Sequence, residues 1–247
     1  MIERHKRILD ALSQDGRMEV TALAEALGVS QVTARKDLKA LEAEGLVRRA
    51  HGFASIGSMD DVAARLAYHY DDKKRIARAA AARVSPGETV MIESGSCCAL
   101  LAGILASEVR DVTIVTNSAF IAGHVRASRA RVVLLGGDYQ GASQVMVGPL
   151  ARKCAQSFFV DKLFIGTDGF SPQFGFMGGD MMRTEAVRAM LSQARHTAIL
   201  TDSSKFSRQG VVPLVAFSEI AQVFTDGGIP EQARSILTGH GIEIITA

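Results

Sequence analysis

Short polar segments that contain glycine or serine follow several apolar runs in the carboxyl-terminal part of this 247-residue chain. Glu93-Ser94-Gly95-Ser96 precedes a predicted helix over 97–108, and the free N–H groups at a helix N-terminus attract anions. Asp202-Ser203-Ser204-Lys205 adds two hydroxyl donors and a mobile cation. Together, these residue types suit a bound phosphate group.

Other polar residues could bind the hydroxyl groups of a small polyol or sugar. Thr116, Asn117 and Asp168 each follow a predicted strand, as does Asp202. The Gly-x4-Gly-Lys spacing is absent and no dinucleotide-binding fingerprint follows the first strand, so the common nucleotide-binding motifs do not apply. Each segment alone could equally consist of turn residues and helix caps. With Gly136-Gly137-Asp138, five polar segments lie at one predicted sheet edge, which favours a ligand site.

Glu185 lies three residues before Arg188 on a predicted helix over 183–194, so it could bind a ligand or pair with that arginine on the surface. Cys97 and Cys98 are expected to be small packing residues. The three cysteines and six histidines form neither a disulfide framework nor a zinc spacing, so we expect no structural metal.

The amino-terminal residues carry a different pattern. Helices are predicted over 3–15, 21–27 and 31–44, with a three-residue turn between the second and the third. Residues 46–52 and 53–56 are predicted to form two short strands around a glycine-containing turn. This order of elements is that of a winged helix-turn-helix.

The predicted third helix and hairpin carry side chains of the types that can contact DNA. The beginning of a recognition helix enters the major groove, where amides and hydroxyls contact base edges and basic side chains reach guanines or phosphates. Val32, Leu38 and Leu41 are expected to face the core instead. A solvated charged face is the alternative because acidic residues lie nearby, but the helix pair and basic hairpin favour DNA. The DNA-binding candidates are Gln31, Thr33, Arg35, Lys36, Lys39, Arg48, Arg49 and His51.

The composition is that of an ordinary globular protein, with 47% hydrophobic and 22% charged residues. No apolar run reaches the ~18 residues of a membrane span. The charged start has no secretory signal. We therefore expect a cytoplasmic protein without a membrane partner. The formal net charge of +2 neither requires nor excludes nucleic acid.

From residue 72 onward, helical segments alternate with short buried strands. Strand candidates lie at 89–93, 112–116, 131–135, 162–166, 197–201, 221–225 and 241–246. This alternation predicts a doubly wound, largely parallel α/β sheet covered by helices on both faces. We expect a winged helix-turn-helix domain over 1–57, a linker over 58–72 and an effector-binding domain over 73–247.

Several segments resemble the DeoR family of bacterial transcriptional regulators. In the amino-terminal part they are residues 4–9, 23–30, 33–41 and 45–52. In the carboxyl-terminal part they are residues 74–77, 93–96, 115–118, 135–137, 147–149 and 202–206. The resemblance covers nearly the whole chain. It implies a winged helix-turn-helix joined to an α/β effector domain whose fold is similar to ribose-5-phosphate isomerases and CoA transferases.

Members of that family commonly respond to phosphorylated sugars, and many repress carbohydrate catabolism. The resemblance implies a repressor with no catalytic residue and no cofactor, which binds a double-stranded DNA operator and is controlled by a small phosphorylated sugar. We expect a homo-oligomer, a dimer or a tetramer, because one winged helix binds a half-site weakly. The alternative is a sugar-phosphate isomerase-like enzyme with an accessory DNA-binding domain, since carboxylates and Lys205 supply acid–base groups. The implied effector contacts are Ser94, Gly95, Ser96, Thr116, Asn117, Asp168, Glu185 and Lys205.

Overall fold

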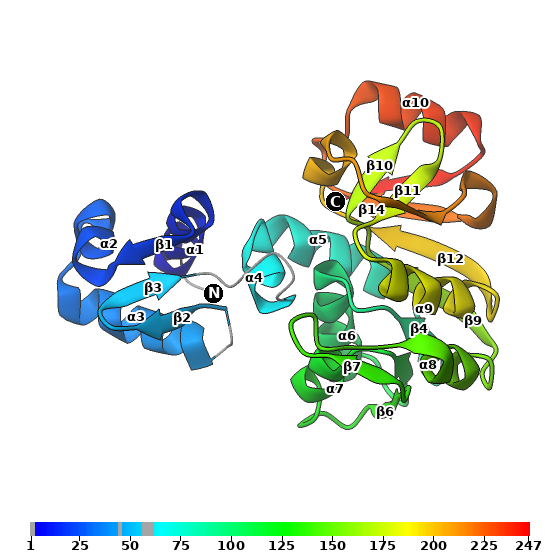
Figure 1. The fold of residues 1–247 in the computed structure, drawn as a ribbon, viewed down its shortest axis with the longest axis horizontal. Coiled ribbons are helices and arrows are strands. Elements are labelled where there is room, and N and C mark those ends of the chain that lie inside the picture. Colours follow the sequence, from blue (N-terminus) through cyan, green and yellow to red (C-terminus); the bar gives the residue numbers. More distant parts are fainter. Residues whose placement is uncertain (1–2, 44–45, 56–61) are drawn as a thin grey trace. The chain divides into compact units, whose positions relative to one another are not determined.

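The computed structural model describes residues 3–43, 46–55 and 62–247. The chain divides into two compact units, Met1–Tyr70 and Asp71–Ala247 (Figure 1). The division falls inside the region 58–72, where a linker is expected. Helix α4 (Val62–Ala67) and the start of helix α5 (Tyr70–Ala81) occupy part of that region, whereas 58–61 lie outside the described residues.

The first unit is the predicted winged helix-turn-helix. Its helices are α1 (Glu3–Asp15), α2 (Val20–Leu27) and α3 (Gln31–Ala43). Strands β2 (Arg48–Ala50) and β3 (Phe53–Ser55) form the predicted hairpin. A third strand, β1 (Arg17–Glu19), pairs with β3 and was not predicted. Side chains from all three helices form the core, among them Ile8, Leu12, Leu23, Leu38 and Leu41.

Two short turns set the geometry of this unit. Gly28 ends α2 in the left-handed conformation, with φ at +69°. Ser30 caps α3, as its spacing predicts, because its Oγ accepts a hydrogen bond of 3.1 Å from the N–H of Thr33. Between β2 and β3, His51 and Gly52 both have positive φ, at 49° and 82°, as a two-residue type I′ turn requires. The turn places His51 at the tip of the hairpin.

A seven-stranded sheet forms the centre of the second unit. Its order is β15-β14-β12-β9-β4-β5-β6, and all six pairs are parallel. The chain winds outward from β4 in one direction and from β9 in the other, so right-handed crossovers place helices on both faces. The predicted doubly wound sheet is confirmed. Its strands are β4 (Thr89–Ile92), β5 (Thr113–Thr116), β6 (Arg131–Leu134), β9 (Val160–Ile165), β12 (Ala194–Leu200), β14 (Gln222–Thr225) and β15 (Glu243–Thr246).

Two small antiparallel sheets were not predicted. One is the hairpin of β7 (Asp138–Gln140) and β8 (Val145–Val147), and the other joins β10 (Gly169–Ser171), β11 (Gly175–Gly178) and β13 (Val212–Val215). The remaining helices are α6 (Ser96–Glu108), α7 (Ala119–His124), α8 (Gly148–Ala155), α9 (Met181–Leu191) and α10 (Glu231–Gly239), with 3-10 turns η1 (Ser203–Ser207) and η2 (Phe217–Glu219). No helix in the described ranges is long and apolar enough to cross a membrane.

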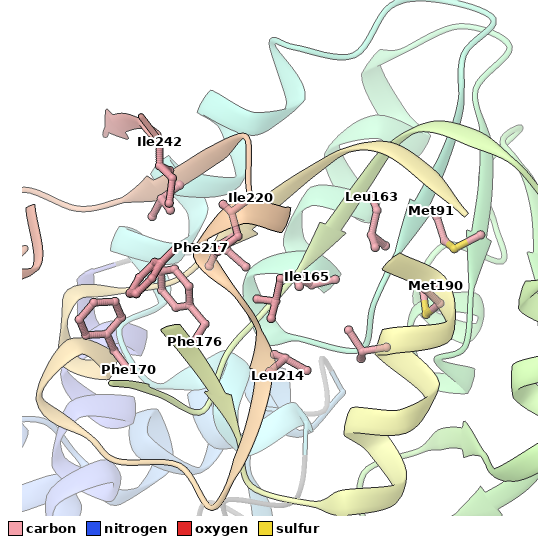
Figure 2. Packing of buried hydrophobic residues seen from close by; sticks show 14 of the residues in the cluster. Met91, Leu163, Ile165, Phe170, Phe176, Met190, Leu214, Phe217, Ile220 and Ile242 are labelled. Atoms are coloured by element: carbon pink, nitrogen blue, oxygen red, sulfur yellow. The ribbon is translucent and has the colours of Figure 1, made fainter. Parts of the chain in front are cut away.

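A large apolar core of the second unit joins the parallel sheet to the sheet of β10, β11 and β13 (Figure 2). Met91 and Leu163 are buried on the parallel sheet. Phe170 of β10 meets the rings of Phe176 on β11 and Phe206 on η1 edge-to-face, with centroid distances of 5.3 Å for both. Because β10 follows β9 and η1 follows β12, this aromatic packing fixes two of the polar segments at the strand ends.

Candidate nucleic-acid interface and ligand site

Helix α3 presents an exposed face that carries its basic side chains. Arg35, Lys36 and Lys39 are exposed, Gln31 is exposed at the first turn, and Thr33 is half-buried. The Gln31 amide oxygen accepts a hydrogen bond of 3.3 Å from the Arg35 guanidinium, and the Thr33 hydroxyl lies 2.9 Å from the Ser30 Oγ. The five predicted helix residues therefore occupy the solvent-facing half of α3, the half that a DNA groove would meet.

Val32 lies on the same face, which contradicts the expectation that it faces the core. It is 75% exposed. The inner face of α3 is formed by Ala34, Leu38 and Leu41, which are fully buried. Val32 precedes Arg35 by three residues, Lys36 by four and Lys39 by seven, so helical geometry places it in the basic stripe.

Asp37 does not oppose this stripe, because it points into the unit. Its side chain is 6% exposed and accepts hydrogen bonds of 2.5 and 3.0 Å from the Arg4 guanidinium on α1. His5 lies 3.4 Å from the same carboxylate. The Arg4 hydrogen bond is the largest cause that holds the pKa of Asp37 below its usual range. The carboxylate is thus neutralised by α1, and the exposed face of α3 stays basic.

The hairpin carries the other predicted DNA contacts, and one of them is held by an acidic partner. Arg48, Arg49 and His51 are exposed. Glu42 of α3 accepts hydrogen bonds of 2.9 and 2.6 Å from the Arg49 guanidinium and one of 3.2 Å from its backbone N–H. The Arg49 pairing lowers the pKa of Glu42. A DNA phosphate must therefore compete with Glu42 for Arg49.

The candidate ligand site lies where the winding direction of the sheet reverses, between β4 and β9. Open α/β sheets bind ligands at the carboxyl ends of the strands at this point. Gly95 follows β4 and Gly166 follows β9, and a Cβ built on Gly95 would lie only 3.1 Å from the Gly166 Cα. The two segments therefore touch, and a larger residue at position 95 would push them apart.

Glu93 was not among the predicted contacts, yet its carboxylate organises this junction. It accepts hydrogen bonds from the backbone N–H groups of Gly95 at 2.8 Å and Gly166 at 3.0 Å, and from the Ser94 hydroxyl at 2.7 Å. Ser94 is buried, whereas Ser96 is half-buried as the first residue of α6. Glu93 thus occupies these two N–H groups, and an incoming anion would have to use the next N–H groups along α6.

Lys73 is a buried cation that was not among the predicted contacts. It lies on α5 with 3% of its side chain exposed, and its Nζ is 3.9 Å from Oδ2 of Asp202, which is likewise buried. Lys205 follows Asp202 on η1 and is half-buried. The burial of Lys73 could have been predicted from its spacing. It precedes the core residues Ile76 and Ala77 by three and four positions and therefore shares their face of the helix.

Cys97, in the first turn of α6, lies within electrostatic range of Lys73 and Lys205 and of the carboxylates of Asp202 and Asp226. Burial is the largest effect and raises the pKa of the Cys97 thiol to about 12. The thiol is therefore protonated at neutral pH. Cys98 is also fully buried. Both cysteines are small packing residues, as the sequence predicts. Helices α5 and α6 and the carboxyl ends of β12 and β14 converge around Cys97.

Asn117, after β5, has an unusual hydrogen-bond state. Its side chain is buried, and its Nδ2 donates to the Met146 carbonyl at 3.3 Å, but its Oδ1 is buried with no hydrogen-bond partner. Thr116 is also buried, and its hydroxyl accepts a hydrogen bond of 3.1 Å from the Ser118 N–H. An unpaired buried acceptor is costly, so this oxygen is suited to receive a donor from a ligand.

The last two predicted contacts differ in their placement. Asp168, half-buried after β9, accepts a hydrogen bond of 2.8 Å from the Gly179 N–H. Glu185 is exposed on α9, and no hydrogen bond in the described part of the chain joins it to the strand ends. Arg188 donates to the Pro213 carbonyl at 2.5 Å, so the surface pair with Glu185 that we considered is not formed. No cluster of three metal-ligating residues occurs among the described residues.

Both halves of the chain match known families. Residues 4–59 match the DeoR-like helix-turn-helix domain, and residues 68–227 match the DeoR C terminal sensor domain. A ribose 5-phosphate isomerase from Methanocaldococcus jannaschii aligns with a TM-score of 0.41 and 19% identity, over 56% of this chain and 54% of the isomerase.

Proteins named as transcriptional repressors align with this chain over nearly the whole length of both proteins. A putative aga operon transcriptional repressor of Escherichia coli O157:H7 is 30% identical, covering 98% of this chain and 93% of the relative. The glycerol-3-phosphate regulon repressor of Escherichia coli is 28% identical, and the alignment covers 98% of this chain and 97% of the relative. These relatives do not support the alternative of an enzyme. With both of its parts matched by that family's models, the chain belongs to the DeoR family of transcriptional regulators.

Proposed function

We propose that this protein represses an operon for the uptake or breakdown of a carbohydrate or polyol, and that a small phosphorylated sugar or polyol controls it in the cytoplasm. The relative named as a glycerol-3-phosphate regulon repressor supports this class of effector. The observation that carries the proposal is the buried pair of Lys73 and Asp202 at the carboxyl ends of the strands. A lysine is almost never fully buried unless it is paired, and a buried cation at this end of the sheet can also attract an anionic ligand.

The phosphate would bind at the first turn of α6. The backbone N–H groups of Ser96, Cys97 and Cys98 lie in the first turn of this helix, where N–H groups have no carbonyl acceptor within the helix. Lys73 and Lys205 bring two positive charges to this end of the sheet, where Asp202 now faces Lys73. A dianionic phosphate would gain charge-assisted hydrogen bonds from both lysines.

The sugar would extend along the ends of neighbouring strands. Strands β5, β4, β9 and β12 lie side by side, so their ends span roughly 15 Å at the usual strand spacing. A sugar hydroxyl could donate to the unpaired Oδ1 of Asn117. Glu93, Ser94, Thr116 and Asp168 provide further hydroxyl partners along the same edge, with Glu185 joining only if α9 brings it closer.

DNA binding would need more than one copy of the first unit. A single winged helix buries little surface and binds a half-site weakly, so we infer a dimer or tetramer on the operator. Gln31, Thr33 and the basic residues of α3 would enter the major groove, while Arg48, Arg49 and His51 would contact the backbone or the minor groove. Ligand binding would favour one arrangement of the DNA-binding units, with a coupling energy of about 1–3 kcal/mol.

A thermal-shift screen of the full chain against phosphorylated sugars and polyols tests the effector class. A ligand at about one hundred times its Kd should stabilise the protein by about 2.7 kcal/mol. Lys205→Ala should lose this shift and the ligand's effect on DNA binding, while the free variant binds DNA like the parent.

The matched control is Lys153→Ala, which removes an exposed lysine from α8. It should keep both the thermal shift and the response. If Lys205→Ala responds like the parent, or if unphosphorylated sugars shift the protein as strongly, the proposed phosphate site is wrong.

A further inference from the structure

Val32 is an apolar residue in the middle of a basic surface. Within the described residues of the first unit it is the only large hydrophobic side chain that is exposed, at 75%. Helical spacing groups it with Arg35, Lys36 and Lys39, all of them exposed. It makes no contribution to the core, which Ala34 and Leu41 fill on the opposite side of α3.

Helix stability gives no reason for valine at this position. A β-branched side chain loses rotamer freedom in a helix, so alanine or a straight-chain polar residue would suit an exposed site better. An isolated exposed apolar residue is common on protein surfaces. The position of Val32 favours a contact with a partner over incidental exposure. It lies one residue after the start of the helix, between Gln31 and Thr33, where recognition helices meet base edges.

The surface around Val32 restricts what can cover it. Three cations within two helical turns would oppose a purely apolar partner, because burying them without counter-charges is costly. The partner must be anionic and must also offer an apolar group at the depth of the helix. The DNA major groove meets both conditions, since phosphates line its rim and the 5-methyl group of thymine projects from its floor.

We propose that Val32 contacts the 5-methyl group of one thymine in each operator half-site and thereby determines specificity for that base. The inference rests on α3 being the recognition helix. Gln31, Arg35 and Lys36 would supply polar and ionic contacts around it, whereas Val32 would distinguish thymine from cytosine and from uracil by the methyl group.

The test is a double-mutant cycle between protein and DNA. The full chain first selects a duplex from a random-sequence pool, and each thymine of that duplex is then replaced by deoxyuridine, which removes only the methyl group. At one thymine per half-site, the parent should bind deoxyuridine about fourfold more weakly, the factor that corresponds to one buried methyl-sized group. In Val32→Ala, this ratio should fall to about one at that position and stay unchanged elsewhere.

Two control variants keep the result interpretable. Val211→Ala removes an 81% exposed valine from the second unit and should keep the fourfold ratio. Val32→Thr keeps the β-branched shape and one methyl group, and should give a ratio between those of the parent and Val32→Ala. Both variants of Val32 should keep the circular dichroism and melting temperature of the parent, because the residue is exposed. If Val32→Ala binds too weakly for comparison, lower salt restores measurable binding.

The inference is overturned if no thymine methyl group affects binding by the parent, or if Val32→Ala retains the same ratio. In either case, selective and salt-dependent binding of the parent would leave the proposed function intact. Absence of any sequence selection, together with binding that does not respond to salt, would instead refute DNA recognition by α3.

Discussion

Replacing Asp37 by asparagine tests how the recognition helix is held against α1. The substitution keeps the shape of the side chain and removes its charge. In the structure this carboxylate is buried, with hydrogen bonds of 2.5 and 3.0 Å from Arg4 and with the His5 Nε2 atom 3.4 Å away. Asparagine can still accept from Arg4 through its one carbonyl oxygen, but it cannot accept both guanidinium bonds.

The size of the effect follows from these contacts. A hydrogen bond to a charged group contributes about 1.5–3 kcal/mol, and the variant loses one such bond. Arg4 is 36% exposed, so solvent screens part of the attraction. We therefore expect Asp37→Asn to lower the free energy of unfolding of the first unit by about 1–2 kcal/mol, below the unscreened range, which speeds hydrogen exchange about 5–30-fold.

Hydrogen exchange with mass spectrometry is the suitable assay, because the chain has no tryptophan to report on unfolding. Peptides that cover α3 should lose protection in Asp37→Asn, whereas peptides from the seven-stranded sheet should not change. Glu42→Gln is the matched control, because it alters an acidic residue of the same helix whose ion pair is exposed. It should leave the protection of α3 close to that of the parent.

The pH dependence gives an independent check. The folded-state pKa of Asp37 is lowered, so its stabilising contribution is present above the unfolded value of about 3.9 and is lost as the pH falls through the folded value. Protection factors of α3 should therefore fall in acid for the parent, and Asp37→Asn should lack this part of the loss. Equal exchange in parent and variant at pH 7, or an identical acid loss in both, would refute the role assigned to this ion pair.

Three further outcomes follow from single contacts. Glu42→Ala releases Arg49 and removes an acidic group beside the hairpin, so DNA affinity should rise severalfold and the log–log salt dependence should steepen by about one; an unchanged slope would show that Arg49 stays away from DNA. A thiol reagent at pH 8 should label the half-buried Cys154 and leave Cys97 unlabelled in the folded protein, because burial raises the pKa of Cys97 to about 12; rapid labelling of Cys97 in a peptide map would contradict this. Gly95→Ala places a Cβ 3.1 Å from the neighbouring loop and should weaken the effector response more than it lowers the melting temperature, whereas a normal response would mean that this junction does not touch the ligand.

The sequence is sufficient to predict the large elements of the fold. The seven strands of the parallel sheet are short apolar runs separated by helical segments, and Ser30 and Gly28 mark the turn before α3. The three-residue strand β1 was missed. It pairs with β3, which lies far along the chain, so no local pattern of residues marks it.

The candidate sites were predicted in part, for similar reasons. Polar residues at strand ends could be found because parallel topology gathers them at one edge. Lys73 was missed, and Glu93 was named in its segment but not assigned a role. Both act through contacts between different segments, Lys73 with Asp202 and Glu93 with Gly166. Val32 was assigned to the core because it is apolar. Its exposure follows from the three-dimensional arrangement of α3, in which alanine and leucines already fill the inner face.

The most direct measurement is the affinity of the full chain for DNA from its own promoter region, titrated with a phosphorylated sugar and with the same sugar unphosphorylated. If each copy neutralises about three phosphates, a dimer should show a log–log salt slope near −5. When several such pairs of sugars are tested, one phosphorylated sugar should change the affinity for DNA about 5–150-fold, and the unphosphorylated form of that sugar should not. Salt-independent binding, or equal responses to both forms of every sugar, would contradict a DNA-binding unit controlled by an anion at the ends of the strands.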